Sequence, residues 1–440
     1  MLDPILVGAL SVAAIFAMIL IGFHVGIALS FVSFVGVFAI TDRFRVAASL
    51  LQTTSYSGIN DYTYAVIPLF VVMGLFATQS GATRDLFNAA ESLMRNLRGG
   101  IGVATVIANA IFAAITGVSV ASAAVFSKLA IPEMNRLGYD QRFALGIVGS
   151  SALLGMLIPP SILMIIYGVL TEESIGRLFA AGIGPGLVVA LCLAISILWR
   201  VRRTPTLAGR EGIESAVVVD ASAHPVLKVW PVLVLILLVL GGIYGGLFTP
   251  TEAGAIGALG TLILMLVRGQ FSAASLMAIL RETGKTCASI FFLLITAQMY
   301  SRMLTLSGLP EMLTTWASHL AVPGMVVLAA FIFVLLALGC IIDSVSIMLL
   351  TMPIMAPIAS SFGYDKIWFG MIAIVAIELG LLTPPFGMVV FAMKASLPDD
   401  VGTEEIFAGV MPFFLVLLAA LMLIMFFPQI SLWIPHVLFG

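Results

Sequence analysis

Serine and threonine hydroxyls gather beside breaks in the apolar runs of this chain. A broken helix within a membrane leaves carbonyl and amide groups without partners, which supplies cation ligands and an anion-binding helix end together. Carbonyl and hydroxyl oxygens suit a hard monovalent cation such as Na⁺. The pattern predicts one central site for a cation and a polar substrate, whose candidate substrate-binding side chains are Thr116, Ser119, Ser122, Asp343, Ser344 and Ser346.

Two of the breaks are copies of one another. Gly155-Met-Leu-Ile-Pro-Pro-Ser161 recurs 225 positions later as Gly380-Leu-Leu-Thr-Pro-Pro-Phe386. An ungapped comparison of residues 119–160 with 344–385 gives 12 identities in 42 positions, among them a Gly-Tyr-Asp triplet and both prolines. The agreement of Pro and Gly in one register indicates an internal repeat.

Each of these residues also has a plainer structural interpretation. The Pro-Pro pairs could only kink a helix, and the hydroxyls could bond to carbonyls four residues back. Asp343 could cap the helix that follows it. Glu378, an intramembrane acid, is a candidate for an ion or substrate role, whereas Glu252 resembles a first-turn helix acid after Pro250.

Composition places the chain among polytopic membrane proteins. Of its 440 residues, 61% are hydrophobic and only 10% are charged, with a net charge of −2. The three cysteines stand singly in apolar runs and indicate neither a disulfide framework nor a zinc site. A phosphate loop and a His-Glu-x-x-His motif are both missing from the sequence, which argues against an ATP-driven pump or an intramembrane metalloprotease. We expect no enzymatic activity.

The apolar runs differ in length, and the short ones predict hairpins. Residues 101–135 and 323–360 are each cut into arms too short to cross a bilayer, so we expect re-entrant hairpins. Residues 142–171 and 366–397 are expected to cross once each as broken helices. Two amphipathic interfacial helices are expected at 82–98 and 308–320. Uninterrupted spans are expected near 4–22, 26–40, 62–80, 178–199, 230–247, 249–267, 285–305 and 406–427.

Five crossings and one hairpin per half predict an inverted repeat of about ten crossings. The halves are residues 1–199 and 229–428, joined by a polar cytoplasmic linker at 200–228 and followed by a tail at 429–440. Most Lys and Arg residues then lie on the linker side, as the positive-inside rule requires. Both termini are expected on the side opposite the linker.

Several motifs resemble the large membrane subunit of tripartite ATP-independent periplasmic (TRAP) transporters. They are Pro68-Leu-Phe-Val-Val-Met-Gly74, Pro132 to Tyr139, the Ile-Pro-Pro-Ser run, Gly182-Ile-Gly-Pro-Gly186, Thr249-Pro-Thr-Glu-Ala-Gly254 and Thr383-Pro-Pro-Phe-Gly387. The resemblance covers nearly the whole chain. It implies an elevator-type, sodium-driven importer of an organic acid, such as a C4-dicarboxylate or sialic acid, in a bacterial inner membrane.

The resemblance also implies partners and sodium ligands. The partners are a separate small four-helix membrane subunit and a periplasmic substrate-binding protein. Residue-by-residue matching implies Na⁺ ligands at Ser119, Gly155, Ile158, Pro160, Gly339, Gly380, Thr383 and Phe386. One departure concerns Ser119, because this chain reads Thr116-Gly-Val-Ser119 where many relatives read Ser-Gly-Ser-Ser. Two alternatives stay open, namely a stand-alone carboxylate carrier of related fold and a non-coupled channel or scaffold subunit.

Overall fold

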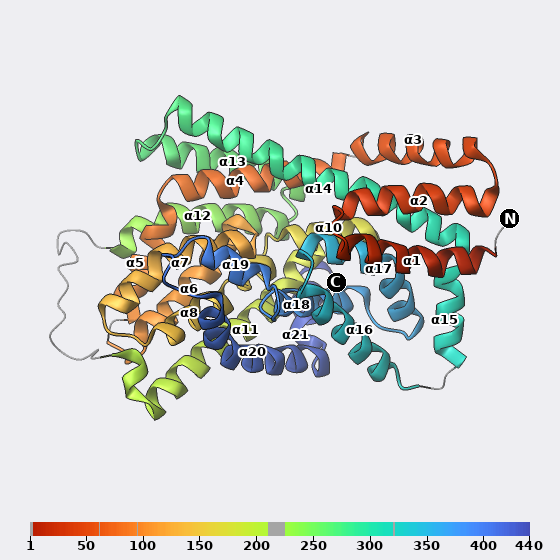
Figure 1. The fold of residues 1–440 in the computed structure, drawn as a ribbon. Helices are drawn as coiled ribbons and strands as arrows, with labels where there is room; N and C mark the ends of the chain where they lie inside the picture. The colour runs from red at the N-terminus through yellow and green to blue at the C-terminus, as the bar shows by residue number, and fades with distance from the viewer. Residues whose placement is uncertain (1–2, 61, 95, 210–224, 320–321) are drawn as a thin grey trace.

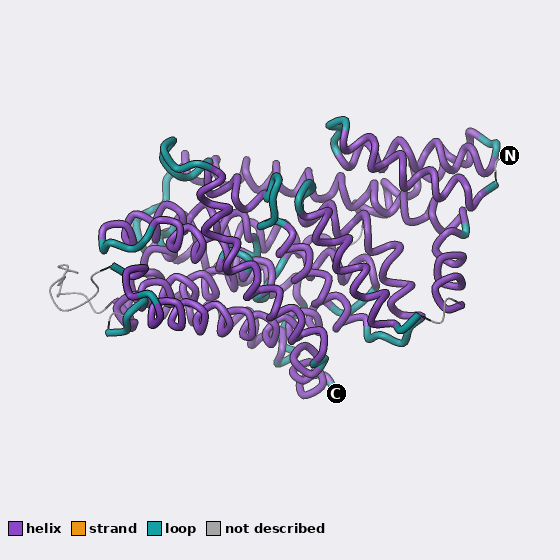
Figure 2. The backbone as a smooth tube through the Cα atoms, turned by 60° about the horizontal axis from the view of Figure 1, so that its bottom comes forward, coloured by secondary structure: helices purple, strands orange, loops and turns teal. Residues whose placement is uncertain are grey.

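The fold is built from α-helices. The computed structural model describes residues 3–440 apart from residues 61, 95, 210–224 and 320–321, and apart from the side chains of 59, 225–227 and 318–319. Within these residues all regular secondary structure is helical (Figure 2), which confirms the expected all-α class. Most of the predicted linker at 200–228 lies outside the described residues.

The first half of the chain contains eleven α-helices up to the linker. In order they are α1 Pro4–Leu20, α2 Val25–Thr41, α3 Phe44–Asn60, the short 3₁₀ helix η1 Tyr62–Ala65, α4 Val66–Gln79, α5 Ala82–Met94, α6 Gly100–Thr116, α7 Ser119–Arg136, α8 Gln141–Ser151, α9 Leu154–Leu157, α10 Ile162–Thr171 and α11 Ile175–Arg203, followed by η2 Pro205–Ala208.

The second half repeats most of this order. Its helices are α12 Pro225–Tyr244, α13 Pro250–Val267, α14 Ala273–Ser307, α15 Leu309–His319, α16 Gly324–Gly339, α17 Ser344–Ser361, α18 Lys366–Gly380, α19 Met388–Lys394, α20 Thr403–Phe426 and α21 Gln429–Phe439. Helices α2 and α13, α7 and α17, and α8 and α18 each begin at residues that are 225 positions apart. The inverted orientation of the halves stays a prediction.

The repeated Gly-Tyr-Asp triplet sets the boundary between each hairpin and its broken helix. Gly138 and Gly363 have φ of 80° and 78°, which glycine adopts without the steric cost of a Cβ atom. Asp140 and Asp365 then cap α8 and α18, each accepting a hydrogen bond from the amide three residues on, at 2.9 and 3.0 Å. The triplet therefore ends one helix and starts the next.

The helices form two layers in Figure 1. Helices α2, α3, α4, α13 and α14 lie along the upper side, where α13 packs on α4, and α14 packs on α2, α3 and α4. The hairpins α6–α7 and α16–α17 lie below them with the broken helices and α11, α20 and α21. The uninterrupted helices α11 and α20 therefore share a layer with the hairpins, and the division into a scaffold and a moving domain stays a prediction.

Two helices were not expected from the sequence. Helix α3 carries Arg45, Gln52 and several hydroxyl residues, so it does not form an apolar run, yet it packs against α2 and α14. Helix α21 occupies the region expected as a tail and packs against α11. In both cases packing against a neighbour adds helical structure that hydropathy alone does not indicate.

Several helices are long and apolar enough to cross a membrane. Among the described residues there are six such helices, and a seventh span is possible if the bent pair α8–α9 and α10 is counted as one. Shorter apolar helices, such as α1, α2, α6 and α16, are 16 or 17 residues long. The total of about ten crossings therefore stays a prediction.

Candidate functional site: two hairpin tips and two helix breaks

The tip of the first hairpin is seated in the first helix break. Gly117, at the tip, has a φ of 63°, and its carbonyl accepts a hydrogen bond from the Ile162 amide at 3.4 Å. A Cβ atom on Gly155 would lie 2.8 Å from the Ser119 Cα, and one on Gly117 would lie 2.6 Å from the Pro160 oxygen. Glycine at these positions allows two backbones to touch.

The tip of the second hairpin packs on the second break through different glycines. A Cβ atom on Gly380 would lie 2.7 Å from the Gly339 Cα and 2.9 Å from the Leu336 oxygen. The repeat mate of Gly339 is Ala114, so this contact has no equivalent in the first half. The hairpin tip and the helix break therefore make contact through different residues in the two halves.

Each hairpin also reaches across to the other half. The first arms pack on their own broken helices, α6 on α8 and α9, and α16 on α18. The second arms pack on the opposite half, α7 on α19 and α17 on α10. The hairpins and broken helices of the two halves are therefore interlocked in one core.

Glu378 joins the two hairpin tips. This residue of α18 is 1% exposed, and its carboxylate lies beside the hydroxyls of Ser119 and Ser344, the first residues of α7 and α17. Neither carboxylate oxygen meets a donor with standard hydrogen-bond geometry, although both hydroxyls lie beside the carboxylate. Ser119 and Ser344 are repeat mates, so equivalent ends of the two hairpins meet at one acid.

The predicted hydroxyls divide into two groups. Those of Thr116 and Thr383 donate to the carbonyls of Phe112 and Leu379, four residues back, each at 3.1 Å, which is the plainer structural interpretation. By contrast, Ser119 and Ser122 are fully buried and their hydroxyls have no hydrogen-bond partner. Ser344 and Ser346 are buried at the start of α17. The unpartnered hydroxyls lie at the first tip.

The two tips differ in how their second arms begin. Asp343 caps α17, since its carboxylate accepts a hydrogen bond from the Ser346 amide at 3.0 Å. The equivalent position in the first half is Val118, which gives α7 no side-chain cap. The first amides of α7 therefore have no side-chain cap from the protein, whereas the Ser346 amide of α17 bonds to the Asp343 carboxylate.

The implied sodium ligands lie around the two breaks, which differ in exposure. Gly155, Ile158 and Pro160 lie at the break between α9 and α10, and Pro159 and Pro160 are buried there. Thr383 and Phe386 lie at the break between α18 and α19, where Pro384, Pro385 and Phe386 are exposed. Both Pro-Pro bonds are cis. The structure places each set of implied sodium ligands beside the hairpin tip of its own half.

Three residues of this site were missed in the sequence. Gly117 carries the tip contact described above, and Val118 leaves α7 uncapped. Ser161 donates to the Met156 carbonyl at 2.5 Å and accepts from the Met164 amide at 3.4 Å, so it caps α10. Its place directly after Pro159-Pro160 was the available signal, because a serine at that point is a typical N-cap.

Glu252, on the outer layer, takes the structural role that was considered for it. Its carboxylate accepts hydrogen bonds from the Thr249 amide and hydroxyl at 2.8 and 2.9 Å, completing a capping box at the start of α13.

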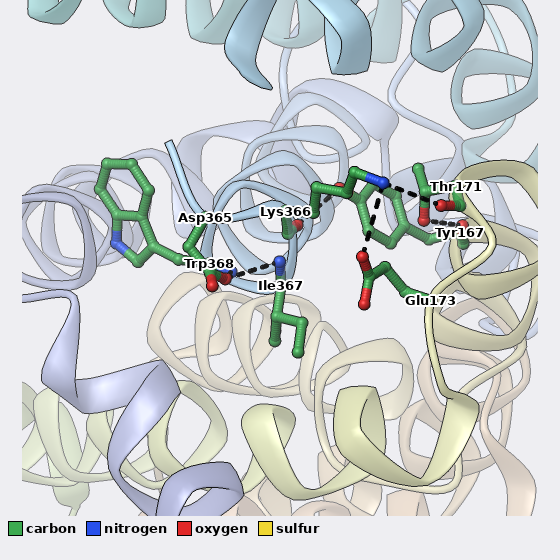
Figure 3. Close-up of polar contacts among 7 residues, drawn as sticks. All are labelled: Tyr167, Thr171, Glu173, Asp365, Lys366, Ile367 and Trp368. Carbon is green, nitrogen blue, oxygen red and sulfur yellow. Dashed lines mark hydrogen bonds and ion pairs between the residues drawn. The ribbon is translucent and has the colours of Figure 1, made fainter. Parts of the chain in front are cut away.

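Polar contacts join the two broken helices at one end of the core. The Tyr167 hydroxyl in α10 donates to the Lys366 carbonyl at 2.6 Å, and the Lys366 ammonium lies 3.6 Å from Glu173 and 3.5 Å from the Thr171 carbonyl. Figure 3 shows these groups converging on the start of α18. The contacts hold elements of both halves together.

These contacts predict a ranking of two substitutions. Tyr167 is fully buried, so Tyr167→Phe removes a buried hydrogen bond and should lower the free energy of unfolding by about 1–2 kcal/mol. Lys366→Ala should cost about 0–1 kcal/mol, because the Lys366 side chain is 47% exposed. Thermal unfolding of the purified protein in detergent checks the ranking, and a larger loss for Lys366→Ala would contradict it.

The interlocked hairpins, broken helices and apolar outer layer are those of a multi-pass membrane protein. A solved structure of the YdaH transporter from Alcanivorax borkumensis has the same fold, with a TM-score of 0.65, 16% identity and coverage of 90% of both chains. The MtrF structure from Neisseria gonorrhoeae has a TM-score of 0.60 and 12% identity over 90% of this chain and 85% of that one.

Sequence comparison identifies the family. Residues 12–430 match the family described as the tripartite ATP-independent periplasmic transporter, DctM component, and the chain belongs to this family. It is 34% identical to the C4-dicarboxylate TRAP transporter large permease protein DctM of Pseudomonas aeruginosa, over 89% of both chains. It is 31% identical to the sialic acid TRAP transporter large permease protein SiaM of Vibrio cholerae, over 87% of this chain and 88% of that one.

Proposed function

We propose that this chain is the membrane-embedded transport subunit of a sodium-coupled uptake system for an organic acid. The observation that carries the proposal is the pairing of each hairpin tip with a helix break. Such pairing gathers carbonyl groups at helix ends, which are the ligands that Na⁺ uses at broken helices. The family assignment supports a transport role and does not by itself identify the coupling ion.

The sodium ions would be held by main-chain and hydroxyl oxygens at the two breaks. Ser119, Gly155, Ile158 and Pro160 would supply the first set, and Gly339, Gly380, Thr383 and Phe386 the second. The close backbone contacts at Gly155 and Gly380 support these sets, because they bring the carbonyls of tip and break into one region. Oxygens of both the tip and the break would coordinate the ion. Bound Na⁺ would therefore stabilise the conformation in which the tip is packed on the break.

The acid group of the substrate would bind at the start of α7. Ser119 and Ser122 offer hydroxyl donors, and the first amides of α7 offer a helix end that favours an anion. Thr116, Asp343, Ser344 and Ser346 would complete the pocket. Related permeases are named for C4-dicarboxylate, sialic acid and isethionate, and all of these are organic anions.

The partners would be a small four-helix membrane subunit and a periplasmic substrate-binding protein. A related permease from Oleidesulfovibrio alaskensis is named DctMQ, and this chain, 30% identical to it, covers 59% of its length. The assembly would lie in the bacterial inner membrane with both termini of this chain in the periplasm.

The outer layer would act as the scaffold, and the interlocked hairpins and broken helices would carry the site across the membrane. Uptake into proteoliposomes tests this proposal. A sodium gradient should drive accumulation of a carboxylate only when a binding protein is added. Accumulation without a binding protein would favour a stand-alone carrier, and uptake that never exceeds equilibrium would favour a channel.

Thr383→Val is expected to weaken the sodium dependence of uptake. The substitution keeps the shape of the side chain but removes the hydroxyl from the second break. The sodium concentration for half-maximal uptake should rise roughly tenfold, as is usual when one ligand-binding interaction is lost. The same measurement on Thr305→Val, an exposed hydroxyl that bonds to the Ser301 carbonyl four residues back, is the control. Unchanged sodium activation in Thr383→Val would count against this ligand.

A further inference from the structure

Glu378 is a buried acid without a countercharge at the junction of the two hairpin tips. Its two carboxylate oxygens and the hydroxyl of neighbouring Ser119 have no hydrogen bond of standard geometry. The residue is 1% exposed, so water does not solvate the carboxylate from outside the protein. Burial of an ionised carboxylate without a countercharge is strongly unfavourable.

Four of the surrounding helices supply no positive side chain. Helices α9, α10, α16 and α17, which carry the first break and the second tip, contain no Lys, Arg or His. Lys366 stands at the opposite end of α18 and lies beside Glu173 instead. Among the described residues the ion pairs do not include Glu378.

The proposed sodium ligands, by contrast, lack a negative charge. They are main-chain carbonyls and the hydroxyls of Ser119 and Thr383, so they contribute no net charge. A cation taken into the core by neutral oxygens alone keeps its full charge in a medium of low polarity. A buried cation and a buried carboxylate at the same junction would each offset the free-energy cost of burying the other charge.

We propose that Glu378 supplies the fixed negative charge that holds a coupling Na⁺ where the two hairpin tips meet, with Ser119 and Ser344 lining this cation site. The inference rests on the proposed sodium-coupled function. The repeat mate of Glu378 is Leu153, so the core carries one such charge for both halves. The charge is therefore shared between the two tips rather than duplicated.

This position also gives a physical reason for coupling. Without the cation, the Glu378 carboxylate repels a substrate acid group from the start of α7, because Ser119 borders both. With the cation bound, this repulsion is cancelled and the substrate is accepted. Binding of the cation and binding of the anion then reinforce each other, as reciprocal coupling requires.

The test is sodium binding to the purified protein, measured without substrate. Thermal unfolding in detergent is followed as NaCl replaces KCl at constant ionic strength. Glu378→Gln keeps the shape and removes the charge, so the Na⁺ concentration for half-maximal stabilisation should rise by at least about tenfold. Glu378→Asp keeps the charge and should give a smaller rise. Glu282→Gln, on the exposed side of α14, should match the wild type.

The outcomes separate this inference from the function on which it rests. A wild-type sodium midpoint in Glu378→Gln, or equal losses in the Gln and Asp variants, would reject a role for the charge. If the Gln variant does not fold, Glu378→Leu, which introduces the residue type of the repeat mate Leu153, is measured in its place, and a wild-type midpoint in that variant would reject the role. A wild-type protein that Na⁺ stabilises no more than K⁺ would reject sodium coupling itself, before any variant is considered.

Discussion

Replacing Gly380 by alanine should abolish uptake and lower the melting temperature of the protein. The new Cβ atom would lie 2.7 Å from the Gly339 Cα and 2.9 Å from the Leu336 carbonyl oxygen, which are both backbone atoms. A clash with a side chain could be relieved by a change of rotamer, whereas a clash with the backbone requires helix α16 to move. Overpacking of this kind typically costs about 1–3 kcal/mol, and here it also separates the second tip from its break.

Gly284→Ala is the matched control for this substitution. Gly284 lies in helix α14, and a Cβ atom there would meet no atom within 4 Å. Alanine also favours the helix by about 1 kcal/mol relative to glycine. Both variants are compared in proteoliposome uptake and in thermal unfolding. Wild-type uptake by Gly380→Ala would show that contact between tip and break is dispensable.

An acid at position 118 should abolish transport of an organic anion without unfolding the protein. Val118 is the repeat mate of Asp343, and Asp343 caps its helix by accepting a hydrogen bond from the Ser346 amide. In Val118→Asp the new carboxylate would accept a hydrogen bond from an uncapped amide in the first turn of α7, as Asp343 does in α17. It would occupy the proposed substrate position and repel a second anion.

A neutral cap separates charge from geometry in this experiment. Val118→Asn can accept the same hydrogen bond, and it should reduce uptake less than the aspartate variant does. A side-chain cap usually contributes about 1 kcal/mol to helix stability, so neither variant should melt far below the wild type. Uptake and thermal unfolding are measured together. An active Val118→Asp protein would place the substrate acid group elsewhere.

Much of the site could be predicted because its signals are local. Proline removes a backbone donor and blocks a helix, so Pro159-Pro160 and Pro384-Pro385 mark the breaks wherever the chain folds. The short apolar arms marked the tips, and the structure places them at 117–118 and 340–343. The Gly-Tyr-Asp triplets likewise marked the ends and starts of helices.

The role of individual polar residues depended on their neighbours in the structure. Thr116 and Ser119 are three positions apart in one motif, yet one hydroxyl bonds within its own helix and the other has no partner. Asp343 could have been a ligand or a cap, and it is a cap in this structure. These outcomes depend on which backbone groups are free nearby, and sequence spacing does not record that.

Hydropathy, glycine and proline act on neighbouring residues, so a helical membrane protein with a repeated pair of breaks could be predicted from the sequence. Three features were visible only after folding: each hairpin also packs on the other half, one break is buried and the other exposed, and Glu378 lies beside both Ser119 and Ser344. These features join residues far apart in the chain, and they follow from packing between helices, which no local pattern specifies.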